Sequence, residues 1–161
     1  MSLLTKILSP GNILIDVDAS SKKRVFEQIA LMMENTQGIA RSAVFDCLFS
    51  RERLGSTGLG HGVAIPHGRI KDLEEECGVF IRLSTPIPFD APDGEPVDLL
   101  FALLVPEQAS DIHLQLLSEL AGKFNNPDFR EALRAAPDIP SVYSLLTGEN
   151  DHASDDRSAT V

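Results

Sequence analysis

The sequence predicts a single-domain α/β (α+β) fold in which a mixed β-sheet lies between helices. The chain has 161 residues, a length that suits one domain with a substantial core. Amphipathic helical segments occupy residues 20–54 and 111–146. Short apolar runs bounded by Pro, Gly and Asp lie between them, at 62–66, 78–84 and 97–105. Such runs are typical of strands that are covered on both faces, so we expect helices, then strands, then helices.

The first predicted helix covers residues 20–35, where apolar side chains recur at helical spacing after a serine N-cap. Gly38 follows its end, as is common after helices. The second helix begins after Ser42 and runs to Arg53, before a glycine stops it. We therefore expect Arg51 at the C-terminus of a helix, beside a glycine-rich loop.

The predicted strands 78–84 and 97–105 are joined by a proline-rich loop with a turn signal at Asp93-Gly94. Three helices follow the last strand. The first begins at Asp111, the second begins with Pro127 at its first turn, and the third covers 139–146.

The predicted domain covers residues 1–147, and residues 148–161 are predicted to form a disordered acidic C-terminal tail. The tail has no aromatic residue and only small apolar ones, so it cannot bury enough surface to offset its ordering entropy.

Charge and hydropathy exclude several classes of partner. The chain carries 14 basic and 24 acidic residues, a net charge of −10, so we expect no nucleic-acid partner. No apolar run is long enough to span a bilayer, and the N-terminus lacks the features of a signal peptide. We therefore expect a cytoplasmic protein without membrane insertion. Cys47 and Cys77 form no CxxC motif, which favours reduced thiols over a disulfide.

A glycine-rich stretch at 55–70, GSTGLGHGVAIPHGRI, suggests a phosphate site. Gly55 and Gly60 have the spacing of a nucleotide P-loop, but His61 and Gly62 stand where Lys and Ser/Thr are required. The dinucleotide fingerprint Gly-x-Gly-x-x-Gly also fails. His61 and His67 do not have a standard metal-ligand spacing. We therefore expect neither a nucleotide nor a metal, and no cofactor.

Two histidines remain as candidates for phosphate chemistry. The short strand ending at Pro66 is predicted to carry His67 on a fixed backbone at the edge of the sheet, where sites collect. His113 shares the apolar stripe of its helix, so it should point inward or toward a cleft. Structural roles are the alternatives: His67 could be a capping or turn residue, and His113 could be a core residue whose ring nitrogens have hydrogen-bond partners. With Arg51, these residues suggest a neutral imidazole that attacks phosphorus while charged groups stabilise the phosphoryl oxygens.

The run SRERLGSTGLGHGVAIPHG resembles the active-site signature of the enzyme IIA domains of the phosphotransferase system (PTS), fructose/mannitol class. The resemblance is greatest to the nitrogen-regulatory branch. It continues through TPIPFDAPDGEPVDLLFALLVPE and IHLQLLSEL, and covers about residues 3–147. It implies a mixed five-stranded sheet flanked by helices on both faces.

The resemblance also implies roles for individual residues. His67 fills the position of the phosphorylated histidine, His113 that of a second histidine which hydrogen-bonds the phosphoryl group, and Arg51 that of a charge-stabilising arginine. Three loop residues match the lining of the phosphate pocket: Ser56, Thr57 and Gly58.

The implied function is a phosphotransferase that carries a phosphoryl group. It would accept phosphate from a phosphohistidine of an HPr-like nitrogen phosphocarrier onto His67, and regulate partner proteins, which the sequence does not identify, by its phosphorylation state. A sugar-specific IIA component that passes phosphate to a IIB protein is the alternative within this chemistry. A phosphate-independent interaction module is the alternative of another class.

Overall fold

The computed structural model describes residues 3–108 and 111–148. Helices and strands follow one another along the chain as α1 Leu4–Ile7, η1 (a 3-10 helix) Pro10–Asn12, β1 Ile13–Val17, α2 Lys22–Gln37, α3 Arg41–Leu54, β2 Gly58–Gly60, β3 Val63–Ala64, β4 His67–Ile70, β5 Cys77–Ile87, β6 Val97–Pro106, α4 Asp111–Phe124, α5 Pro127–Ala135 and α6 Ile139–Thr147. The predicted tail lies outside the described residues, apart from Gly148.

The sheet is mixed, and its strands lie in the order β1-β5-β6-β3-β2, with β4 also paired to β6. Strand β6 runs antiparallel to β5 and parallel to β3 and β4. The sheet has six strands where the resemblance implied five. The difference arises because Ile65 and Pro66 interrupt one extended segment, so that its two halves, β3 and β4, pair separately with β6.

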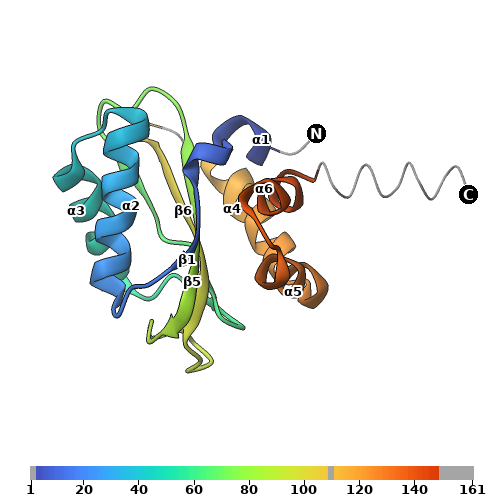
Figure 1. Cartoon of the computed structure of the whole chain (residues 1–161). Coiled ribbons are helices and arrows are strands. Elements are labelled where there is room, and N and C mark those ends of the chain that lie inside the picture. The colour runs from blue at the N-terminus through green and yellow to red at the C-terminus, as the bar shows by residue number, and fades with distance from the viewer. Residues whose placement is uncertain (1–2, 109–110, 149–161) are drawn as a thin grey trace, which may run out of the picture.

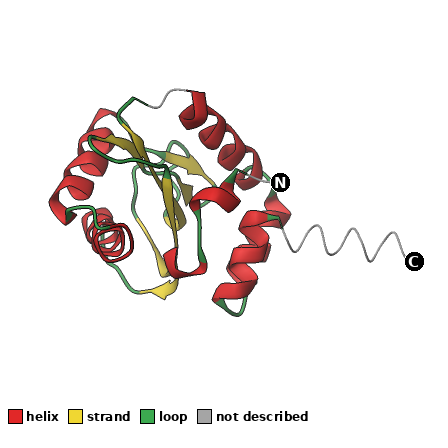
Figure 2. Ribbon diagram, turned by 90° about the horizontal axis from the view of Figure 1, so that it is seen from above, coloured by secondary structure: helices red, strands yellow, loops and turns green. Residues whose placement is uncertain are grey.

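Helices cover both faces of this sheet, which confirms the predicted fold class (Figure 1). Helices α2 and α3 pack on one face, and α1, α4, α5 and α6 lie on the other (Figures 1 and 2). Alternate residues of β6 point to opposite faces, as the pleat of a strand requires. Leu100, Ala102 and Leu104 enter the core beneath α2 and α3. Leu99, Phe101 and Leu103 enter the core beneath the other helices.

The ends of the first two long helices agree with the signals read from the sequence. The Ser21 hydroxyl accepts a hydrogen bond from the Arg24 amide and caps α2, and Gly38 ends this helix in the left-handed conformation at φ 71°. Helix α3 starts at Arg41, slightly before the predicted start after Ser42, and ends before Gly55. The predicted position of the glycine-rich loop after a helix C-terminus is therefore correct.

The prediction that the strand ends at Pro66 was wrong. Proline has no N–H to donate, but its carbonyl oxygen accepts from the Leu103 amide at 2.9 Å, and the ladder with β6 resumes at once. His67 is therefore the first residue of β4, paired with Leu103, and not a residue beyond the end of a strand.

Strands β1 and β2 and helix α1 were not predicted. The cysteines are free thiols, with Cys77 buried and Cys47 half-buried. Burial raises the pKa of the Cys77 thiol to about 12, with a smaller contribution from Glu76. Within residues 3–108 and 111–148, the structure has no helix that is long and apolar enough to cross a membrane.

Candidate functional site

Strand β4 is an edge strand, since among the described strands it pairs with β6 alone. Alternation along the strand sends neighbouring side chains to opposite faces. Ile70 belongs to the core beneath α2 and α3, and Gly68 faces the same side, where a β-carbon on it would collide with the Cys47 thiol of α3. His67 and Arg69 therefore face the side on which α4 lies. The fold thus presents His67 at an open edge of the sheet.

The imidazole of His67 is tethered to its own backbone. Its Nδ1 lies 2.8 Å from the Ile65 carbonyl oxygen. A carbonyl oxygen can only accept, so Nδ1 must carry the proton and donate it. In the neutral ring, the lone pair is then on Nε2.

His113 of α4 lies beside this ring. The centroids of the two imidazoles are 5.5 Å apart, with an interplanar angle of 76°. His113 is 8% exposed, which agrees with the prediction that it points inward or toward a cleft and not to bulk water. Its Nδ1 is buried and has no hydrogen-bond partner among the described residues, so it is not a satisfied core histidine there. The structure thus brings together the two histidines that were singled out from the sequence.

Both histidines are held toward their neutral forms. Burial lowers the pKa of His67, and the Arg51 charge lowers it further, while the hydrogen bond to Ile65 and the Glu52 charge act in the opposite direction. Burial also lowers the pKa of His113, and the charges of His67 and Arg69 contribute in the same direction. A neutral imidazole keeps the lone pair that a nucleophile needs.

Arg51 lies in the last turn of α3, as predicted. Its Nη1 donates to the Gly55 carbonyl oxygen at 2.8 Å, so the guanidinium holds the start of the glycine-rich loop. It also acts electrostatically on His67. One of its five N–H donors forms the bond to Gly55, and a guanidinium can engage an anion through the others.

The loop residues predicted to line a phosphate pocket direct their donors into the protein. The Ser56 hydroxyl donates to the Phe89 carbonyl oxygen at 2.9 Å and accepts from the Gly58 amide at 3.0 Å. The Thr57 hydroxyl donates to Glu52 at 2.6 Å. A β-carbon at Gly58 would lie 2.7 Å from that of Ala91, so only glycine fits. These contacts give the loop a fixed shape.

Sequence reasoning missed two charged residues of the site, Arg69 and Glu52. Arg69 follows His67 by two positions and so shares its face, but this signal was lost when the strand was ended at Pro66. Glu52 is buried and contacts the loop through Thr57. An acidic residue in the last turn of a helix opposes the helix dipole, which is a signal that could have marked it.

His61, which has no role in this site, is an exposed turn residue. It adopts the left-handed conformation at φ 57°, its amide donates to Asp93 at 2.8 Å, and its carbonyl oxygen accepts from Arg134 at 2.8 Å. In the part of the chain that the structure describes, no group of three His, Cys, Asp or Glu side chains is placed to hold a metal ion.

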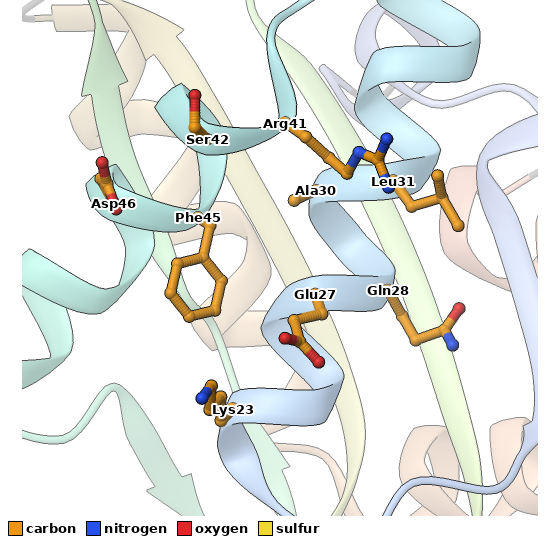
Figure 3. A pocket seen from close by; sticks show the side chains of 9 residues that line it. All are labelled: Lys23, Glu27, Gln28, Ala30, Leu31, Arg41, Ser42, Phe45 and Asp46. Carbon is orange, nitrogen blue, oxygen red and sulfur yellow. The ribbon is translucent and has the colours of Figure 1, made fainter.

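A separate groove of about 450 Å³ lies between α2 and α3, on the other side of the sheet from His113. Figure 3 shows the ring of Phe45 of α3 lying in the space beside Lys23 and Glu27 of α2. Basic, acidic and apolar side chains line this groove, and no histidine is among them. Its chemistry is unrelated to that of the two imidazoles.

Comparison with known proteins identifies a family for the chain. Residues 6–148 match the family described as "Phosphoenolpyruvate-dependent sugar phosphotransferase system, EIIA 2". The chain is 44% identical to a nitrogen regulatory protein from Pseudomonas aeruginosa over 147 residues, covering 91% of this chain and 96% of that one. It is 41% identical to a nitrogen regulatory protein from Bradyrhizobium diazoefficiens, covering 89% and 94% of the two chains.

Solved structures show the same fold. The nitrogen regulatory protein IIA-Ntr from Neisseria meningitidis superposes with a TM-score of 0.87 at 49% identity, covering 91% of this chain and 100% of that one. The mannitol IIA protein from Escherichia coli superposes with a TM-score of 0.74 at 21% identity, covering 86% and 98% of the two chains. The second likeness concerns the fold alone.

Proposed function

The chain belongs to the EIIA 2 family of the phosphoenolpyruvate-dependent sugar phosphotransferase system, and on that premise we propose that it is a cytoplasmic phosphoryl carrier of the nitrogen-related branch. In this proposal it accepts a phosphoryl group from a phosphohistidine of an HPr-like phosphocarrier and regulates partner proteins by its phosphorylation state. The observation that carries the proposal is the pairing of a tethered His67 with the ring of His113, 5.5 Å away. The similarity to nitrogen regulatory proteins supports the choice of branch.

His67 is the nucleophile in this mechanism, and Nε2 is its attacking atom. Because Nδ1 keeps its proton and donates it in a hydrogen bond to the Ile65 carbonyl oxygen, the lone pair is on Nε2 before the donor arrives. The bond between phosphorus and the donor imidazole breaks as the bond from Nε2 to phosphorus forms, and the donor nitrogen recovers its electron pair. Such transfer depends mostly on positioning and charge stabilisation, which side chains can supply.

His113 and Arg51 stabilise the charge on the phosphoryl oxygens. The buried Nδ1 of His113, which has no hydrogen-bond partner among residues 3–108 and 111–148, supports a role as a donor to phosphate, because an unsatisfied buried polar atom is costly. Arg51 supplies positive charge from the end of α3. In this proposal Ser56, Thr57 and Gly58 line the phosphate site and contribute through the shape of the loop, since the two hydroxyls and the Gly58 amide already have partners.

Phosphorylation would place about −1.5 to −2 charges at one point of the surface. Such a local change in charge is large enough for a partner protein to distinguish the two forms. The site is therefore suited to a regulatory switch as well as to relay of the phosphoryl group.

Incubation with a phosphorylated HPr-like carrier tests this function. We expect the wild type and a His61→Gln control to take up one phosphoryl group, seen as a mobility shift on a native gel, and His67→Gln to take up none. Phosphate uptake by a folded His67→Gln variant would contradict the assignment. For His113→Gln and Arg51→Lys we expect single-turnover transfer to slow by roughly 100-fold, the loss typical of one donor to a developing charge.

A sugar-specific IIA component is the second candidate. The chain is 38% identical to a fructose-specific EIIA component from Haloferax volcanii, over 66% of this chain and 69% of that one. Competition between a nitrogen-type and a sugar-type phosphocarrier, each at equal concentration, separates the two functions. Faster transfer from the sugar-type carrier, followed by transfer to a fructose IIB protein, would favour the second candidate.

A phosphate-independent interaction module is the remaining alternative from another class. Its prediction is that partner proteins bind wild type, His67→Gln and the phosphorylated form with equal affinity. Binding that differs between the phosphorylated and unmodified forms would exclude it.

A further inference from the structure

We propose that Glu52, paired with Lys22, is a positioning residue that fixes the orientation and tautomer of His67. The predicted effect on the rate of phosphoryl transfer rests on the proposed function. The arrangement of side chains on which it depends is separate from that function and can be tested without it.

The Glu52 carboxylate is buried and fully engaged. Its side chain is 3% exposed, although it carries a charge. It accepts from the Thr57 amide at 3.2 and 3.3 Å, from the Thr57 hydroxyl at 2.6 Å, and from the Lys22 ammonium at 3.0 Å. Burial of a carboxylate costs free energy unless such partners compensate for the lost water. Loss of any of these contacts is therefore unfavourable, and Glu52 holds Thr57 and Lys22 in place.

Glu52 and Lys22 each lie at the unfavourable end of a helix. Lys22 is the first residue of α2, where the positive end of the helix dipole disfavours a cation, and the first turn of α2 contains no acidic residue. Glu52 lies near the C-terminus of α3, where the dipole disfavours an anion. Each charge breaks a local rule, and the two satisfy each other across the helix pair. Conflicts of this kind occur at functional sites, where tertiary need overrides local preference.

Lys22 also connects Glu52 to the segment that supports the other side of the loop. Its ammonium lies 4.5 Å from the centroid of the Phe89 ring and 3.5 Å from the Asp90 carboxylate. The Phe89 carbonyl oxygen in turn accepts from the Ser56 hydroxyl. One cation thus joins both supports of the glycine-rich loop.

A continuous chain of hydrogen bonds runs from Glu52 to the imidazole. The Thr57 amide and hydroxyl are held by Glu52, and the Thr57 carbonyl oxygen accepts from the Ile65 amide at 3.0 Å. The Ile65 carbonyl oxygen then accepts from Nδ1 of His67 at 2.8 Å. Hydrogen-bonded chains in a low dielectric reinforce one another. The last acceptor in this chain determines which nitrogen of the ring is protonated and where Nε2 points.

The matched variants are Glu52→Gln and, as control, Glu34→Gln. Glutamine has nearly the shape of glutamate, but its amide nitrogen cannot accept, so it cannot serve the donors of both Thr57 and Lys22. Glu34 is also a carboxylate between α2 and α3, since it accepts from Arg41 at 3.0 Å, but it is partly exposed and lies at the other end of the helix pair.

The first readout is the ¹⁵N spectrum of the imidazoles. We expect the Nδ1-protonated form of His67 to dominate in wild type and Glu34→Gln, and to lose population in Glu52→Gln. We also expect the apparent pKa of His67 to fall in Glu52→Gln, because the negative charge of Glu52 opposes the lowering of that pKa by burial and by Arg51 of α3. His113 of α4, the neighbouring ring, is the same residue in both proteins. A purely structural role would lower the stability of the fold and leave the tautomer of His67 as in wild type, which would overturn the proposal. The pKa of His67 serves to show that the Glu52 charge has been removed, since that charge acts on the ring through space.

The second readout is single-turnover phosphorylation by the HPr-like carrier. We expect Glu52→Gln to slow transfer at least 10-fold while Glu34→Gln matches wild type. If the wild type takes no phosphate, the proposed function fails, and the ¹⁵N comparison still decides the positioning role. If Glu52→Gln does not fold, the double variant Lys22→Met with Glu52→Gln removes both charges together. A wild-type tautomer of His67 in that variant would overturn the proposal.

Discussion

The imidazole of His67 is subject to two effects, a hydrogen bond to the backbone and burial. The bond from Nδ1 to Ile65 orients the imidazole, and burial keeps it neutral by lowering its pKa. His113 has the same direction of shift, again with burial as the largest cause. The folded state therefore favours the neutral form of both rings. A nucleophilic imidazole requires this neutral form.

These shifts predict a pH dependence of stability. The unfolded chain binds protons at its histidines near the ordinary pKa of about 6.5, and the folded chain binds them only at lower pH. Stability from this source is therefore present above about pH 6.5 and is lost as the pH falls toward the folded pKa values of His67 and His113. Urea unfolding at a series of pH values between 7.5 and 5 measures this loss of unfolding free energy.

Replacement of either ring should remove part of that pH dependence. We expect His67→Gln and His113→Gln each to show a smaller loss of unfolding free energy on acidification than wild type, because glutamine does not titrate. Curves parallel to that of wild type in both variants would show that the two histidines are not held neutral by the fold.

Among the elements, α5 shows how a local cap and a distant arginine together satisfy the two ends of one helix. Helix α4 carries His113, and α5 follows after a short connection. The Asn126 side chain accepts from the amides of Asp128 and Phe129 at the start of α5, beside Pro127. Arg82 of β5 donates to the carbonyl oxygens of Leu133 and Ala136 at the other end. Both ends of α5 thus have partners for their free backbone groups.

The cap at Asn126 should contribute stability without contributing to phosphoryl transfer. We expect Asn126→Ala to lower the free energy of unfolding by about 1 kcal/mol, and Asn126→Ser, which retains a capping oxygen, to lower it by less. Urea denaturation followed by circular dichroism measures both. A transfer rate that falls in proportion to the lost stability would show instead that α5 takes part in positioning His113.

For the whole molecule, the sheet separates two cores that share β6. One core lies beneath α2 and α3 and the other beneath α1, α4, α5 and α6. Glu52 and the glycine-rich loop approach His67 from the α3 side, and His113 approaches from α4. The site therefore draws its residues from both helical layers.

The two layers should unfold as one cooperative unit. Leu100 is fully buried in the core beneath α2 and α3, whereas Tyr143, the only tyrosine in a chain without tryptophan, packs in the other core. We expect Leu100→Ala to lower the free energy of unfolding by about 2–5 kcal/mol. Midpoints from tyrosine fluorescence and from circular dichroism should fall together. Separate transitions for the two probes would show that each layer unfolds by itself.

The elements that the sequence predicted well are those whose signals are local. Helix α2 has its serine cap, its apolar stripe and its closing glycine within the segment itself. Strand β6 is a long apolar run, as expected for a strand covered on both faces. Strand β4 was missed because a proline preceded it, and its existence depends on pairing with β6, which is distant in sequence.

The sequence by itself determined the fold class, the family resemblance and the candidates His67, His113 and Arg51, because periodicity, caps and motifs are properties of neighbouring residues. Only the tertiary structure decided that the two histidine rings lie 5.5 Å apart, that Nδ1 of His67 is tethered, and that Lys22 pairs with Glu52. These contacts join separate helices and strands. The physical reason is that packing on the two faces of the sheet, and not the spacing along the chain, decides which of these polar groups meet.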